Sequence, residues 1–136
     1  LAMIGGKPAI SYCDNVNTSL KFAINTATDG SGTWNTYTAD DSGLGVGFND
    51  SLAEVDGRPA ISYGGSLGMT EAVLRYAICE NADGSGSWTT KDVEGPSANA
   101  YYYTSLAVVN GKPAISYTDA DRNLKFARSD TVDGTG

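Results

Sequence analysis

The sequence predicts an all-β fold in which one four-stranded unit is repeated along the chain. The first observation is a seven-residue segment, Gly-(Lys/Arg)-Pro-Ala-Ile-Ser-Tyr, that occurs at Gly6–Tyr12, Gly57–Tyr63 and Gly111–Tyr117. A period of about 50 residues is typical of repeat architectures. The second observation is that no window shows the spacing of apolar residues that indicates an amphipathic helix. The third is that turn-forming residues recur at matching positions in each unit.

The repeat places residues 1–136 in a single domain. Its units lie at about 1–50, 51–104 and 105–136, named here repeats 1, 2 and 3, and repeat 3 stops before its last strand. We expect about eleven strands, with four in each of the first two repeats and three in the third.

The first two strands of each repeat form a predicted hairpin. The first strand is an apolar run: Leu1–Ile4, Ser51–Val55 or Ser105–Val109. The next two residues are Gly-Gly, Asp-Gly or Asn-Gly, which accept positive φ at both positions of a type I′ turn. The second strand is Pro-Ala-Ile-Ser-Tyr, and its proline can open a strand because a missing ladder donor is tolerated there.

A glycine-rich turn separates the third and fourth strands. The third strand is Leu20–Ala23, with Leu74–Ala77 and Leu124–Ala127 as its counterparts. An Asp-Gly-Ser-Gly turn follows in repeats 1 and 2, and the fourth strand then begins at Trp34 or Trp88.

Burial on both faces of the sheets is the feature that selects the architecture. In the run Ser105–Val109, the residues after Ser105 that would point to one face of the strand and those that would point to the other are both apolar. A sheet with one face in water instead alternates apolar with polar residues. Four-stranded units that are covered on both faces fit the radial blades of a β-propeller. The alternative is a β-sandwich, which rarely shows such close internal repetition.

The turn before each tryptophan resembles the Asp-box of sialidase-like propellers. Asp29 and Trp34 match this motif in repeat 1, Asp83 and Trp88 match it in repeat 2, and Asp133 opens the turn of repeat 3. The resemblance implies a structural role for these five residues, away from any catalytic centre. The whole repeat also resembles arrays in bacterial secreted proteins, which implies a secreted or cell-surface location.

Composition excludes several classes of function. Nine Lys and Arg residues against sixteen Asp and Glu residues give a net charge of −7, which argues against nucleic-acid binding. No apolar stretch is long enough for membrane insertion. The absence of histidine excludes Ser-His-Asp and Cys-His catalysis, and the sequence predicts no cofactor and no metal site. Cys13 and Cys79 fall at different strand ends, so we expect two separate thiols.

Charged residues that could serve a hydrolase carry no recognisable motif. Paired carboxylates are the usual machinery of a glycosidase. Arg58 and Arg75 stand where other repeats have lysine, so we expect structural roles for both. The segment Asp119–Asn123 resembles the opening of a calcium loop but is interpreted as a polar turn. The acids considered, and expected to be mostly solvated, are Asp40, Asp41, Glu54, Glu71 and Glu94.

The variable loops define the face on which we expect a ligand. In a propeller, the turns that follow the second and fourth strands share one face, and loops on a rigid scaffold commonly carry function. The aromatic cluster Tyr101, Tyr102 and Tyr103 of repeat 2, with Phe48 in the corresponding part of repeat 1, is the candidate ligand-binding site. The alternative is that these rings pack between blades. The variable loops are residues 14–19, 64–72, 119–123, 43–50 and 95–104.

These observations predict a non-catalytic extracellular binding or scaffold module with a glycan or a protein as ligand. Lectin-like glycan binding is the sharper interpretation, and a fragment of a sialidase-like glycoside hydrolase propeller is the alternative. Propellers close with about four to eight blades. Three repeats therefore predict either a ring-like homo-oligomer or a part of a longer propeller chain.

Overall fold

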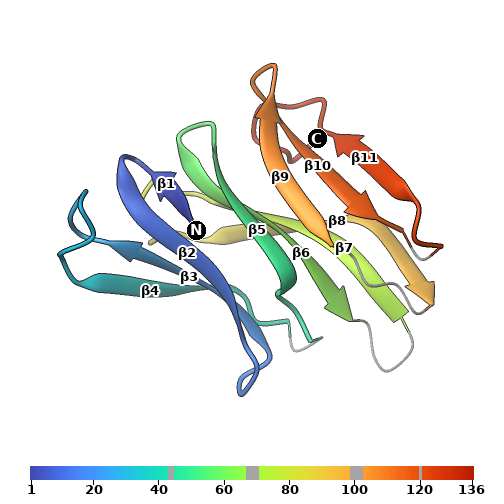
Figure 1. Cartoon of the computed structure of the whole chain (residues 1–136), viewed down its shortest axis with the longest axis horizontal. Coiled ribbons are helices and arrows are strands. Elements are labelled where there is room, and N and C mark those ends of the chain that lie inside the picture. The colour runs from blue at the N-terminus through green and yellow to red at the C-terminus, as the bar shows by residue number, and fades with distance from the viewer. Residues whose placement is uncertain (43–44, 67–70, 99–102, 120) are drawn as a thin grey trace.

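The structure consists of three antiparallel sheets that lie side by side in chain order (Figure 1). The computed structural model describes residues 1–42, 45–66, 71–98, 103–119 and 121–136. Within these ranges no helix is long and apolar enough to cross a membrane. Sheet 1 comprises β1 (Ala2–Ile4), β2 (Lys7–Asp14), β3 (Ser19–Asn25) and β4 (Trp34–Asp40). Sheet 2 comprises β5 (Phe48–Val55), β6 (Arg58–Ser66), β7 (Glu71–Cys79) and β8 (Trp88–Ala98), and sheet 3 comprises β9 (Thr104–Val109), β10 (Lys112–Thr118) and β11 (Leu124–Arg128).

Each sheet is a simple meander, so the predicted propeller-blade topology is confirmed, and the described residues form the expected eleven strands. Within each sheet, strands that are consecutive in the chain pair with each other, in the orders β1-β2-β3-β4, β5-β6-β7-β8 and β11-β10-β9. The predicted hairpin turns have positive φ at both positions, for example 50° at Asp56 and 71° at Gly57. The fourth strands begin at Trp34 and Trp88, as the repeat alignment predicts.

Three of the predicted loops are shorter than the sequence indicated. Strand β5 begins at Phe48, so Phe48–Asp50 lies in a strand and not in the preceding loop. Strand β8 continues to Ala98, and β6 continues to Ser66. These extensions contain glycine and polar residues, which have low strand propensity, but pairing with an adjacent strand holds them extended.

The hydrophobic core lies between the sheets in two layers. The first layer joins residues of sheets 1 and 2, such as Leu20 and Phe22 with Ile61 and Tyr63. The second joins residues of sheets 2 and 3, such as Leu74 with Ile115. Each sheet is therefore stabilised mainly by burial against its neighbours, because adjacent faces remove apolar surface from water.

The expectation that every sheet is covered on both faces is correct only for sheet 2. In β6 every residue from 59 to 65 is buried. In β9 only Leu106 is buried, while Val108 and Val109 are 45% and 38% exposed. The sequence run that predicted two-sided burial is in sheet 3, which has one neighbouring sheet and not two.

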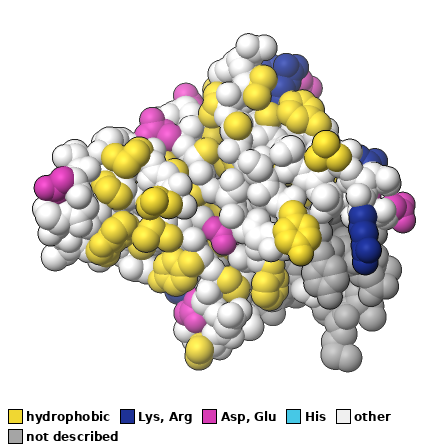
Figure 2. All heavy atoms as spheres, in the orientation of Figure 1, with side chains coloured by type: hydrophobic (Ala, Val, Ile, Leu, Met, Phe, Trp, Pro, Cys, Tyr) yellow, Lys and Arg dark blue, Asp and Glu magenta, His cyan; other side chains and the backbone are white. Residues whose placement is uncertain are grey.

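Exposed hydrophobic side chains accordingly gather on the two outer sheets. Figure 2 shows them grouped over sheet 1. Phe48 is the one large exposed hydrophobic residue that sheet 2 contributes among the described residues. Sheet 1 and its loops contribute Leu1, Met3, Ile10, Tyr12, Val16 and Trp34, and the region of sheet 3 contributes Tyr103, Val108, Val109, Leu124, Phe126 and Val132.

Candidate functional site

The starts of two adjacent strands, β5 and β9, form the candidate site, which we call the inner mouth. It consists of Phe48, Asn49, Asp50, Tyr103 and Thr104. Strands β5 and β9 are the first strands of their sheets and lie beside each other (Figure 1). The Oγ1 atom of Thr104 lies 3.0 Å from the carbonyl oxygen of Asn49, so a hydrogen bond joins the two strands at this point.

A β-bulge shapes the inner mouth on the β5 side. Phe48 pairs with Gly64 and Ser51 pairs with Ser62, so Asn49 and Asp50 stand between two paired positions. Asn49 has a φ of 51°, a left-handed conformation that asparagine adopts more readily than most residues. Bulges turn side chains out of the regular alternation. The alternation of side chains along a regular strand therefore does not reveal the positions of Asn49 and Asp50 in the sequence.

Serine residues on the second strands tie the inner mouth to the neighbouring sheets. The hydroxyl of Ser11 in sheet 1 donates a hydrogen bond to the carboxylate of Asp50. The hydroxyl groups of Ser62 and Thr104 lie 2.8 Å apart, which connects sheet 2 to sheet 3 in the same way. Ser11 and Ser62 occupy the same position of the repeated Ile-Ser-Tyr segment, and that periodicity is the sequence signal that locates these contacts.

Two aromatic rings at the inner mouth are open to solvent. The exposed fraction is 65% for Tyr103 and 49% for Phe48. Tyr101 and Tyr102, the other members of the predicted cluster, lie outside the described residues. The structure thus brings Tyr103 and Phe48 to the starts of neighbouring strands, which are separated by more than 50 positions in the sequence.

Acidic side chains considered for hydrolysis hold neighbouring sheets together. The hydroxyl of Tyr63 in sheet 2 donates to Asp40 of sheet 1 over 2.7 Å. Asp40 is buried, which differs from the solvated position expected for it. Burial, followed by the hydrogen bond from Tyr63 to Asp40, raises the pKa of the Tyr63 phenol well above its usual range. Tyr117 donates to Glu94 at the matching place between sheets 2 and 3.

Arg75 completes the cluster around Asp40. Its guanidinium contacts Asp40 at 3.2 Å and Asp92 at 2.7 Å, and it also donates to the hydroxyl of Ser42. Asp40 and Ser42 belong to the end of sheet 1, whereas Arg75 and Asp92 lie on β7 and β8 of sheet 2. The cluster is therefore a joint between sheets, and its carboxylates are occupied by fixed partners.

The aspartates of the Asp-box-like turns fix the turns themselves. Asp29 accepts hydrogen bonds from the backbone N–H and the hydroxyl of Ser31, and Asp83 does the same with Ser85. The side-chain and backbone hydrogen bonds from these serines lower the pKa of both carboxyl groups.

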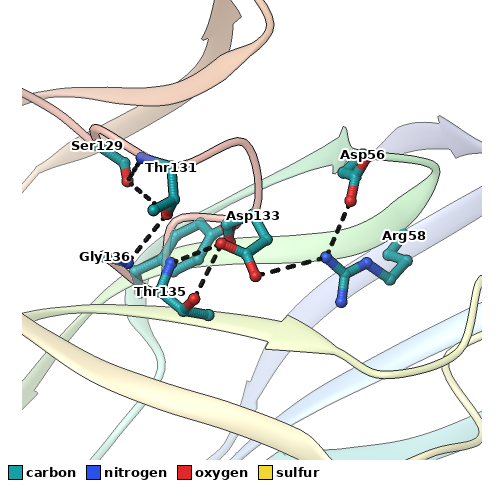
Figure 3. Close-up of polar contacts among 8 residues, drawn as sticks. Asp56, Arg58, Ser129, Thr131, Asp133, Thr135 and Gly136 are labelled. Carbon is teal, nitrogen blue, oxygen red and sulfur yellow. Dashed lines mark hydrogen bonds and ion pairs between the residues drawn. The ribbon is translucent and has the colours of Figure 1, made fainter.

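The turn of repeat 3 also reaches the preceding sheet (Figure 3). Asp133 accepts hydrogen bonds from the backbone N–H and hydroxyl of Thr135, and the Arg58 guanidinium lies 3.9 Å from its carboxylate. Arg58 is also 3.2 Å from Asp56. The phenol of Tyr76 donates to the backbone carbonyl of Asp133 over 3.0 Å. The turn is thus anchored to sheet 2 through side chains and backbone together.

Glycines of these turns lie directly against aromatic rings of the preceding sheet. A Cβ atom at Gly84 would lie 2.3 Å from the ring of Phe22, and one at Gly134 would lie 2.6 Å from the ring of Tyr76. The indole of Trp88 packs on Phe22 with ring centroids 5.4 Å apart. Each turn therefore packs on the third strand of the sheet before it.

The remaining candidates show local roles. Asp119 accepts hydrogen bonds from the backbone N–H groups of Asp121 and Asn123, which fits a polar turn. No group of three or more metal-ligating side chains occurs among the described residues. Cys13 and Cys79 are free thiols, and burial is the main cause that raises the pKa of the Cys13 thiol.

Comparison with known proteins identifies the architecture. No protein-family model and no curated protein matches the sequence. The fold is that of β-propeller blades. The chain is similar to the crystal structure of α-L-arabinofuranosidase from Lactobacillus brevis, with a TM-score of 0.64 and 15% sequence identity. The match covers 93% of this chain and 46% of that chain, so this chain spans less than half of the propeller enzyme it resembles.

Proposed function

We propose that the chain is a non-catalytic binding module that holds a neutral glycan at the inner mouth. The observation that carries this proposal is the exposure of Tyr103 and Phe48 at the starts of two adjacent strands. Aromatic rings present a flat apolar surface together with, for tyrosine, a hydroxyl that forms hydrogen bonds. A sugar ring offers the complementary combination of an apolar face and peripheral hydroxyl groups.

Polar groups around the two rings support binding of a neutral sugar. Asn49 and the carboxylate of Asp50 provide hydrogen-bonding groups next to Phe48, and Thr104 follows Tyr103. The net charge of −7 and the carboxylate of Asp50 disfavour anionic ligands such as sialic acids. The rigid sheets position these groups in advance, which reduces the entropy lost when a ligand binds.

A glycan-array comparison tests this proposal. Wild-type protein should give saturable signals for neutral glycans, and Tyr103→Ala and Phe48→Ala should each reduce affinity at least tenfold. The matched control is Tyr12→Ala, which removes a tyrosine that is 40% exposed elsewhere on the surface. Wild-type signals that survive both inner-mouth substitutions, or the absence of any wild-type signal, would contradict the proposal.

The second candidate function is glycoside hydrolysis, and its support is the arabinofuranosidase named above. Glycosidases usually require two carboxyl groups that flank the scissile bond. Within the five residues of the inner mouth, Asp50 is the single acid, and Ser11 donates a hydrogen bond to it. A panel of chromogenic glycosides that includes an α-L-arabinofuranoside separates the candidates. Turnover that Asp50→Asn abolishes would favour the hydrolase.

We further propose that the module acts outside the cell as part of a larger propeller, with a second chain packed on its outer sheets. The repeat's resemblance to secreted arrays supports the location. The contacts between sheets support the assembly, because the tyrosine–acid and ring–glycine contacts recur in register. The ring of Phe126, which corresponds to Phe22 and Tyr76, is 64% exposed on sheet 3. The Gly30 turn of sheet 1, which corresponds to the turns of Gly84 and Gly134, is the surface that fits such a ring.

A further inference from the structure

A cavity of about 260 Å³ lies between sheets 2 and 3, on the side away from their first strands, β5 and β9. Its walls come from β7 and β8 of sheet 2, from β10 and β11 of sheet 3, and from the turn of repeat 3. It is smaller than the pockets that usually hold drug-sized ligands. Its lining includes Tyr76, Val93, Ile115, Ala127 and Gly134.

The joint between sheets 1 and 2 shows what fits at the corresponding place. There the indole of Trp88 packs on Phe22, at 5.4 Å between centroids and an interplanar angle of 55°. The Nε1 atom of Trp88 donates to the carbonyl oxygen of Gly84 over 3.4 Å. Aromatic pairs at such distances and angles are favourable beyond the area they bury.

The cavity offers the same two contacts to an indole. Tyr76 on β7 corresponds to Phe22 on β3, and Gly134 corresponds to Gly84 in the turn. Both Tyr76 and Gly134 line the cavity. The repeat alignment therefore places at the cavity the counterparts of both residues that contact the indole between sheets 1 and 2, and we call this cavity the socket.

The outer edge of sheet 3, at β11, lies next to the cavity. Strands β3 and β7 each pair on both sides, with β4 and β8 as their outer partners. Among the described residues β11 pairs with β10 alone. An unpaired edge presents a row of N–H and C=O groups that an extended peptide can join.

We propose that the β11 edge and the adjoining socket bind an extended segment with the sequence of the repeat's own fourth strand, led by tryptophan and antiparallel to β11. The indole enters the socket, and the backbone extends sheet 3. Charge favours the fourth strand of repeat 2. Its Asp92 pairs with Arg75 in sheet 2, and Lys125 occupies the position of Arg75 on β11.

A labelled peptide with the sequence of residues 87–94, Ser-Trp-Thr-Thr-Lys-Asp-Val-Glu, tests the proposal on the intact chain. Fluorescence anisotropy should show saturable binding with one peptide per chain. Hydrogen exchange should slow at the amides of β11. Replacing the tryptophan of the peptide with alanine should weaken binding at least tenfold, because the socket then stays unfilled.

A charge swap checks the register. The Lys125→Glu protein should bind the peptide several-fold more weakly, and a peptide with lysine in place of the aspartate should restore affinity for that variant. Lys125 is 46% exposed, and its ion-pair partner Asp119 lies in the turn before β11, so the substitution leaves the core intact. Equal binding of the alanine peptide, no binding of either peptide, or protection at β4 or β8 instead of β11 would overturn the proposal. None of these outcomes depends on glycan binding at the inner mouth.

Discussion

At the scale of single residues, the tyrosine of the Ile-Ser-Tyr segment forms a hydrogen bond to an acid of the preceding sheet in repeats 2 and 3. Tyr63 reaches Asp40, and Tyr117 reaches Glu94. The acids are 54 positions apart, as are the tyrosines, so the pair is a property of the repeat. Asp40 is buried, and a buried carboxylate is stable only when hydrogen bonds or opposite charge compensate its lost hydration.

We expect Tyr63→Phe to lower the free energy of unfolding by about 2 kcal/mol, since hydrogen bonds to charged groups contribute roughly that amount. The ring stays in place, so the change isolates the hydroxyl. Urea denaturation monitored by tryptophan fluorescence measures the difference.

Tyr12→Phe is the matched control, because Tyr12 holds the same repeat position in sheet 1. Tyr12 is 40% exposed, and no bond from it to an acid is found within the described ranges. Its loss should change the free energy of unfolding by less than about 0.5 kcal/mol. Equal effects of the two substitutions would show that the bond to Asp40 contributes nothing.

At the scale of elements, the Asp-box-like turn combines a backbone requirement with a packing requirement. Gly30, Gly84 and Gly134 all have a φ of 80°. Gly84 and Gly134 also lie against a ring of the preceding sheet, whereas the atom nearest a Cβ at Gly30 is the Cγ of Pro8 at 3.8 Å. The two requirements can therefore be separated within one chain.

Alanine at Gly30 should cost about 1 to 2 kcal/mol, because a residue with a Cβ is strained at positive φ. Alanine at Gly84 should cost a further 1 to 3 kcal/mol or so, because the Cβ overlaps the ring of Phe22 and overpacking is added to the strain. Thermal or urea unfolding of the two single variants gives the comparison. A cost for Gly84→Ala no greater than that for Gly30→Ala would contradict the proposed packing.

Local sequence signals predicted the elements well and the inner mouth only in part. The turn dipeptides and the tryptophans that open the fourth strands depend on nearby residues, and both were found where expected. The start of β5 depends on pairing with β6 and on a bulge, which no local pattern reveals. Phe48 was therefore found as a candidate while Asn49 and Asp50 were missed. Burial of Asp40 was missed for a related reason, since its partner Tyr63 belongs to another repeat.

At the scale of the whole molecule, the two outer sheets carry the surfaces that we propose a second chain covers. Sheet 3 presents the exposed ring of Phe126, and sheet 1 presents the turn of Gly30 beside Trp34, which is 43% exposed. Head-to-tail packing of a second chain would cover both surfaces. Two chains of three sheets make a ring of six, within the range of about four to eight blades that closes propellers.

We expect light scattering at micromolar protein to give twice the 14.1 kDa mass of one chain. Phe126→Asp should shift the protein to the monomer, because it places a charge in the joint. Val16→Asp, at a side chain that is 91% exposed in a turn of sheet 1, should leave the mass unchanged. A wild-type monomer, or an equal effect of both substitutions, would contradict head-to-tail packing.

Repeat 2 makes the same kinds of contact with the sheet before it and with the sheet after it, so a further copy of it would fit between them. A second copy of residues 51–104 inserted after the first would bring Glu94 against a new Tyr63, and Tyr76 against a new Gly84 turn. An acid beside tyrosine and a ring beside glycine are contacts that both existing joints already make. Duplication of this segment in a gene could therefore add a blade without a new interface, and the chain could grow by whole units from a single ancestral blade.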